Sequence, residues 1–141
     1  MDYRFVFQIS AAGMNLEKRR VDVAALNLAN MHAAAPNGQS PYVAQRVVAQ
    51  ALQVDFSRTF DAVAVVDRNV TLAAVRQPPR LAHDPGHPYA NAQGFVAYPA
   101  VDHASEMLTV VSAMRAYEAN VAVAAGARSM AARALEIGGQ S

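Results

Sequence analysis

The sequence contains no cysteine and no tryptophan among its 141 residues. Without cysteine, the chain cannot form a disulfide, bind zinc through thiolates or use a thiol nucleophile. Lys18 is the only lysine, the arginines are scattered, and the net charge is +1. Because nucleic-acid binding depends on clustered basic side chains, we expect no nucleic-acid partner.

Long hydrophobic runs are also missing, although 53% of the residues are hydrophobic. A run such as residues 121–127 is far shorter than the roughly 18 residues that a membrane span needs. We therefore expect a protein that is not embedded in a membrane. The first residues do not resemble a cleavable signal peptide, because Asp2 and Arg4 interrupt them and four charged residues follow at 17–20. Any export is expected to use another route.

Proline is missing from both ends of the chain, since all seven prolines lie between residues 36 and 99. Proline disrupts the interior of a helix, so long helices are permitted only outside this region. We expect an α+β fold with three parts: an N-terminal core helix in residues 1–34, a small β-rich middle domain in residues 35–100, and a C-terminal core helix in residues 101–141.

Both ends carry apolar stripes at helical spacing, and each has a second apolar face. Asp102 suits the N-cap of the second helix, and Gly138 suits its end. Pairing the two helices would cover only one face of each, so the second faces indicate self-assembly. A single helix hairpin with an exposed apolar surface is the alternative. The main stripes are Phe5, Ile9, Ala12, Leu16, Arg19, Val23, Leu26 and Asn30, and Met107, Val110, Met114, Tyr117, Val121, Ala124, Arg128, Ala131 and Leu135.

Three valine-rich segments of the middle region, residues 43–50, 61–66 and 70–75, are typical of strands. Pro36-Asn37-Gly38 indicates a turn, and residues 67–69 are expected to turn a hairpin between the second and third segments. Residues 83–94 contain proline and glycine in a pattern that excludes regular helix or central strand. We expect them to run extended across the surface.

Candidate chemistry is confined to His83, Asp84, His87 and His103. A His-Asp-x-x-His cluster is compatible with a divalent metal. Proline and glycine fill its spacer, however, and no general base completes a mechanism, so a polar turn is the preferred interpretation. The serines lack a nucleophile-elbow context, and there is no glycine-rich phosphate loop. We therefore expect no enzyme activity, no catalytic residue, no metal, no cofactor and no small-molecule substrate.

Two motifs place asparagine in the expected helices: Asn27-Leu28-Ala29-Asn30 and Tyr117-Glu118-Ala119-Asn120-Val121. Asparagine is a mediocre helix former, so its presence inside a helix suggests a buried amide that selects register and partner. A solvated position is an equal alternative for Asn27 and Asn120. Asn30 also fits a helix C-terminus, where asparagine tolerates the left-handed conformation.

The eight residues Val-Ala-Ala-Leu-Asn-Leu-Ala-Asn at 23–30 resemble the N-terminal signature of the bacterial flagellar rod and hook axial proteins. Arg20 stands where that signature has an arginine. Residues 114–121, Met-Arg-Ala-Tyr-Glu-Ala-Asn-Val, resemble the paired C-terminal motif. Asp-Pro-Gly-His-Pro at 84–88, with the Gly-Phe-Val and Tyr-Pro-Ala-Val-Asp segments that follow it, is most similar to the proximal-rod members of this basal-body rod family.

The resemblance implies that the terminal helices pair as an antiparallel, coiled-coil-like core with the middle domain outside it. It also implies helical assembly, with copies of the chain and other rod proteins, into the periplasm-crossing shaft that transmits torque for motility. The flagellar type III export apparatus is an implied partner, and no signal peptide would be cleaved. Assembly contacts are expected at Arg20, Asn27, Leu28, Asn30, Met114, Tyr117, Asn120 and Val121. The alternatives are another axial rod or hook subunit, a helix-rich export adaptor, or a metal protein that uses the histidine loop.

Overall fold

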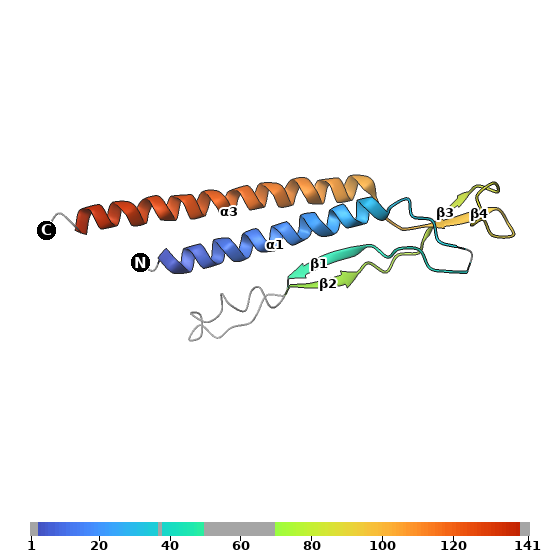
Figure 1. Ribbon diagram of the computed structural model, residues 1–141, viewed down its shortest axis with the longest axis horizontal. Coiled ribbons are helices and arrows are strands. Elements are labelled where there is room, and N and C mark those ends of the chain that lie inside the picture. Colours follow the sequence, from blue (N-terminus) through green and yellow to red (C-terminus); the bar gives the residue numbers. More distant parts are fainter. Residues whose placement is uncertain (1–2, 37, 50–69, 139–141) are drawn as a thin grey trace. The chain divides into compact units, whose positions relative to one another are not determined.

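The computed structural model describes residues 3–36, 38–49 and 70–138. Two long helices occupy the ends of the chain, and short strands lie between them in sequence (Figure 1). The elements are α1 (Tyr3–Asn30), β1 (Gln45–Ala49), β2 (Val70–Ala74), β3 (Arg80–His83), β4 (Phe95–Tyr98) and α3 (His103–Gly138). The expected α+β class is therefore confirmed as two terminal helices with a few small strands.

Helix α1 ends at Asn30, as one interpretation of this asparagine predicts, but Asn30 does not adopt the left-handed conformation. No residue other than glycine has a positive φ in the described ranges. Instead, the Asn30 side-chain amide donates to the Leu26 carbonyl at 2.8 Å, and two short-range backbone bonds follow, from Met31 to Leu28 and from Ala33 to Asn30. Carbonyl groups at the end of the helix are thus hydrogen-bonded by an asparagine side chain and by backbone bonds of shorter range.

Helix α3 begins immediately after Asp102, as its sequence predicts. The Asp102 carboxylate accepts a hydrogen bond from the Ser105 backbone N–H at 3.1 Å, and the Asp102 carbonyl accepts the bond from Glu106 N–H. This side chain satisfies one of the backbone donors that every helix leaves unpaired at its N-terminus. The helix then continues for 36 residues to Gly138.

The strands form two separate two-stranded sheets, β1 with β2 and β3 with β4. The first sheet confirms the strands expected near residues 43–50 and 70–75, and Val75 N–H extends the pairing by donating to the Ala44 carbonyl at 2.8 Å. The strand expected at 61–66 and its turn at 67–69 lie outside the described residues. The sequence analysis missed β3 and β4, which are only four residues long and lack a run of valine.

The loop that joins β3 to β4 is compact, so the extended path expected for residues 83–94 is wrong. Its ends are tied by a bond from Asp84 N–H to the Gly94 carbonyl, and an inner turn is closed by His87 N–H to the Asp84 carbonyl. Asn91 accepts backbone N–H bonds from Gln93 and Phe95 with its side-chain oxygen. The prolines therefore sit in successive tight turns.

The turn expected at Pro36 is present: Gln39 N–H donates to the Pro36 carbonyl at 3.0 Å, and Gly38 has a φ of 83°. Glycine suits this position because it adopts positive φ without a steric penalty.

Two compact units make up the chain, and the division between them falls inside both helices. Among the described residues, the first unit contains residues 3–19, 49, 70–71 and 112–138, and the second contains residues 20–48 and 72–111 apart from residue 37, so the division also passes through β1 and β2. Large side chains are scarce in the interior. The largest that are fully buried are Val96, Asn27, Pro99 and Ser10. The three-part division expected from the sequence stays a prediction.

Candidate assembly interface

Small side chains line the buried face of both helices in the first unit. Ser10 on α1, and Ala113 and Ala127 on α3, are almost fully buried. Gly13 lies so close to Asn120 that a Cβ at Gly13 would meet the Asn120 Oδ1 atom at 2.7 Å. Small residues at such positions let two helix backbones approach closely, and Figure 1 shows these parts of α1 and α3 side by side and running in opposite directions.

Several large residues of the two main apolar stripes lie at the surface of the chain. Ile9 is 48% exposed, Leu26 is 55% exposed and Met114 is 53% exposed. Their immediate neighbours in sequence, Ser10, Asn27 and Ala113, are the buried positions. The most buried positions therefore lie one residue away from the main stripe on each helix. The helix positions that are buried carry small or polar side chains, whereas Phe5, Leu16 and Val23 are only partly exposed.

Each unit exposes large apolar side chains from both helices. In the first unit, Phe7 of α1 and one face of α3 border an open hollow of about 560 Å³. Arg128 supplies its charged group, and most of the lining is alanine and valine. The lining residues are Phe7, Val121, Ala124, Ala125, Arg128, Ser129 and Ala132. The exposed large apolar residues of the helices are Phe7, Ile9, Leu26, Met107, Leu108, Val111, Met114, Tyr117, Val121, Val123, Met130, Leu135 and Ile137.

Asn27 has the most complete set of contacts among the predicted site residues. Its side chain is fully buried, at 0% exposure. Its Nδ2 group donates to the Gln45 carbonyl at 2.8 Å, and its Oδ1 atom accepts from the Gln45 N–H at 3.0 Å. The Tyr42 hydroxyl also donates to Oδ1, at 2.9 Å. The buried amide that the sequence suggested is therefore present, and these partners are the residues at the start of β1.

A second polar contact joins β1 to the beginning of α3. The Arg46 guanidinium lies 3.6 Å from the Glu106 carboxylate and 3.5 Å from the Ser105 hydroxyl. Glu106 is only 5% exposed, whereas the Arg46 side chain is half exposed. Burial raises the pKa of the Tyr42 phenol above its ordinary value, and the negative charge of Glu106 raises this pKa further.

The two predicted motifs lie in different units. Arg20, Asn27, Leu28 and Asn30 belong to the second unit, and Met114, Tyr117, Asn120 and Val121 belong to the first. Arg20 and Leu28 are half-buried, while Met114, Tyr117 and Val121 are exposed. Asn120 donates to the Ala116 carbonyl of its own helix at 2.9 Å and faces Gly13. An assembly role for these eight residues stays a prediction.

Sequence reasoning missed Tyr42, Gln45 and Arg46 as partners of the helices. Tyr42 carries a weak signal, because a tyrosine beside the first strand needs a partner for its hydroxyl. Gln45 contributes its backbone, which no side-chain pattern reveals. Arg46 pairs with a glutamate 60 residues away in sequence (106 − 46), beyond the reach of a spacing argument.

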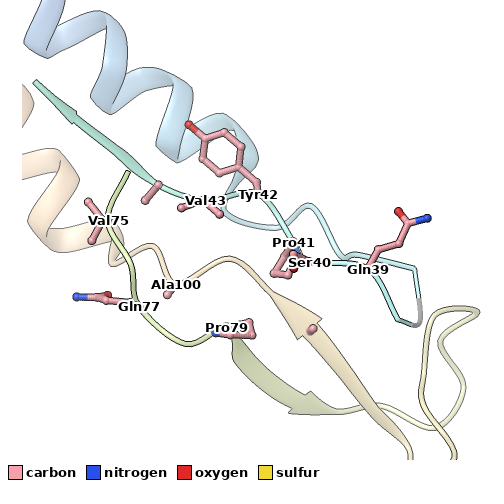
Figure 2. Close-up of a pocket in the computed structure, with 11 residues that line it drawn as sticks. Gln39, Ser40, Pro41, Tyr42, Val43, Val75, Gln77, Pro79 and Ala100 are labelled. Carbon is pink, nitrogen blue, oxygen red and sulfur yellow. The ribbon is translucent and has the colours of Figure 1, made fainter. Parts of the chain in front are cut away.

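A small hollow of about 230 Å³ lies beside this cluster in the second unit. Its lining comes from residues 39–44 with Val75, Gln77, Pro79, Ala97 and Ala100, and Tyr42 is the only ionisable side chain among these. Figure 2 shows the Tyr42 ring directed toward α1, drawn in pale blue. With a single ionisable group, this lining offers no acid–base pair.

The histidines of the β3–β4 loop pack against aromatic rings. The His83 ring lies 5.1 Å from the Phe95 ring, and His87 contacts Tyr89 and Tyr98 edge to face. Across residues 3–36, 38–49 and 70–138, no group of three or more histidines and carboxylates is arranged to hold a metal ion. Over the same ranges, neither helix is long and apolar enough to cross a membrane.

Comparison with known proteins gives one consistent result. The family described as "Flagellar basal body rod FlgEFG protein C-terminal" matches residues 92–137. The flagellar basal-body rod protein FlgC of Escherichia coli O6:H1 is 37% identical over 134 residues, which cover 94% of this chain and 96% of that protein. Its counterpart of Salmonella typhimurium is 36% identical over 137 residues, with the same coverage. That of Bacillus subtilis is 35% identical over 141 residues, covering 92% and 94%.

Proposed function

The chain belongs to the FlgC family of flagellar basal-body rod proteins and is a structural subunit of the rod, and we propose that it assembles there through the exposed apolar faces of its two helices. The main support for this proposal is that Ile9, Leu26 and Met114 are about half exposed, while the adjacent small and polar residues are buried. Because these side chains are already about half buried, covering the rest of one contributes about 0.8–1.5 kcal/mol, roughly half of the value for full burial. Several together offset the roughly 4–15 kcal/mol that association costs.

The proposed core of each subunit is an antiparallel, coiled-coil-like pair formed by α1 and α3. Its support is the close approach of Gly13 to Asn120 and the burial of Ser10 and Ala127 in the same unit. Small residues on the paired face suit a short distance between helix axes. In this arrangement, residues 1–34 and 101–141 form the core, and residues 35–100 form a small β-rich domain outside it.

The eight motif residues divide into two roles in this proposal. Exposed Met114, Tyr117 and Val121 contact neighbouring subunits directly, together with the accessible parts of Arg20 and Leu28. Asn27, Asn30 and Asn120 act within the subunit: each amide bonds a carbonyl, in β1 for Asn27 and in its own helix for the other two. In this proposal, these bonds stabilise the conformation of the helix surfaces that contact the neighbouring subunit.

We further propose that copies of the chain join one another and other rod proteins in the proximal part of the rod. There they would form part of the periplasm-crossing shaft that transmits torque for motility. The subunit would be exported by the flagellar type III apparatus without a cleaved signal. We propose no catalytic role, and neither the export adaptor nor the metal protein is favoured, because the matched relatives are named rod proteins.

Complementation tests this function. In a flagellated bacterium that lacks its own FlgC, this chain is expected to restore rods in purified basal bodies. Met114→Glu places a charge on the exposed stripe and should prevent rod assembly while the helical content of the purified protein stays unchanged. Arg133→Ala, a change at another exposed position of α3, is the matched control. Normal rods from the Met114→Glu variant would show that this face is not an interface.

A further inference from the structure

Asn27 pairs with β1 as a neighbouring strand would. In an antiparallel sheet, a hydrogen-bonded residue pair exchanges both an N–H and a carbonyl bond. The Asn27 side-chain amide does the same with the backbone of Gln45, donating at 2.8 Å and accepting at 3.0 Å. Gln45 is the first residue of β1. A side chain of α1 therefore occupies the place of a strand partner where the sheet begins.

The same short stretch is also tied to α3. Arg46, the next residue of β1, pairs with Glu106, which is nearly buried at the first turn of that helix. Tyr42, three residues before Gln45, adds its hydroxyl bond to Asn27. We call residues 42–46 the strap, because their polar groups reach α1 through Asn27 and α3 through Glu106. All of these residues belong to the second compact unit.

Within the described residues the β1–β2 sheet is small and partly exposed. It has two strands of five residues each there, and Val48 and Leu72 are exposed, whereas Val47 is partly buried. An isolated two-stranded hairpin is marginally stable in water. The hydrogen bonds of the strap therefore add stability that a two-stranded sheet needs.

We propose that the strap couples the order of the β1–β2 sheet to the two helices. The sheet is ordered only while the C-terminal part of α1 and the N-terminal part of α3 are both formed. Asn27 selects Gln45 as the residue at which the sheet starts, and the Arg46–Glu106 pair adds the second helix. Loss of either helix segment releases β1, although no residue of the strands has changed. The inference is independent of how subunits assemble.

Hydrogen exchange on the full-length protein, read by mass spectrometry in dilute solution, tests this coupling. Asn27→Ala removes both bonds to Gln45 and leaves the Gln45 N–H and carbonyl without this partner. Asn30→Ala is the matched control in the same motif. Asn30 bonds only a carbonyl of its own helix. We expect amides of residues 45–49 and 70–75 to exchange at least about tenfold faster in Asn27→Ala, as loss of a buried hydrogen bond implies. The control should match the wild type there.

Two milder variants keep the proposal testable if Asn27→Ala does not fold. Tyr42→Phe removes a single hydroxyl bond, and Glu106→Gln removes the charge at α3 while keeping its shape. Each is expected to raise exchange a few-fold in residues 45–49 and 70–75. Unchanged exchange there in all folded variants would overturn the proposal, and so would increases confined to α1 or a wild type without protection in these strands.

Discussion

Replacing Gly13 by alanine tests the close approach of the two helices in the first unit. A Cβ at this position would lie 2.7 Å from Asn120 Oδ1 and 2.9 Å from its Cγ and Nδ2 atoms, so the Asn120 side chain must move. That movement breaks its 2.9 Å bond to the Ala116 carbonyl. A strained rotamer costs about 0.5–1.5 kcal/mol, and the lost hydrogen bond costs about 0.5–1.5 kcal/mol more.

Gly126 on α3 provides the matched control, because a Cβ there has open space within 4 Å. Gly126→Ala should stabilise the protein by about 0.8–1.0 kcal/mol, the ordinary gain from removing glycine from a helix. Gly13→Ala receives the same gain but also the strain, so the two variants should differ by about 1–3 kcal/mol in unfolding free energy.

Urea unfolding followed by far-ultraviolet circular dichroism measures both free energies. The difference between the two variants should shrink to a few tenths of a kcal/mol in an Asn120→Ala background, where the obstructing side chain is gone. If Gly13→Ala stabilises the protein as much as Gly126→Ala does, Gly13 and Asn120 are not in contact and the helix packing described above is wrong.

Three further predictions concern the Tyr42 phenol, the exposed Met114 side chain and the histidines of the β3–β4 loop. The pKa of Tyr42 is raised above the ordinary value of 10.0, so the folded protein keeps the phenol protonated at a pH where the unfolded chain loses the proton. The stability that the protonated phenol contributes is therefore fully present below pH 10 and is lost as pH rises through the folded pKa. Tyr42→Phe should flatten the decline of the urea unfolding midpoint across that range. Met114→Glu should lower the amount of protein in sedimented basal bodies, with Arg133→Ala unchanged; equal sedimentation of both would remove Met114 from the interface. Replacing His83 and His87 by alanine should leave the metal content of purified protein at zero and reduce rod assembly mildly; metal-dependent rescue of motility in the wild type alone would contradict this.

The sequence predicted the helices well because their limits depend on local chemistry. Proline is confined to residues 36–99, and Asp102 caps the first turn of α3 with its own side chain. The strands β3 and β4 escaped prediction because their pairing depends on contacts between distant residues. Leu81 and Ala97, for example, lie opposite each other only after the loop between them has closed.

The packed face of each helix could not be read from hydrophobicity. A search for large apolar residues selects Ile9 and Met114, yet Ser10 and Ala113 are the ones that are buried. Close helix approach favours small side chains, so within one subunit size outweighs hydrophobicity. The stripe of large residues is better explained by partners that a single sequence does not contain.

Asn27 shows how far the contacts of the candidate site could be predicted from the sequence. Its position inside a helix suggests a buried amide, but the spacing leaves a solvated amide equally possible. Its main partner is the backbone of Gln45, which every residue but proline offers equally. Only the fold determines which backbone group is presented to it.

Photo-crosslinking in assembled basal bodies tests the central claim most directly. A photoreactive amino acid at Met114, on the exposed stripe of α3, should form adducts between this subunit and a neighbouring rod subunit in purified basal bodies. The same variant as a dilute monomer should give none. Basal bodies that contain the variant in normal amounts but yield no intersubunit adduct from Met114 would contradict assembly through the exposed apolar faces.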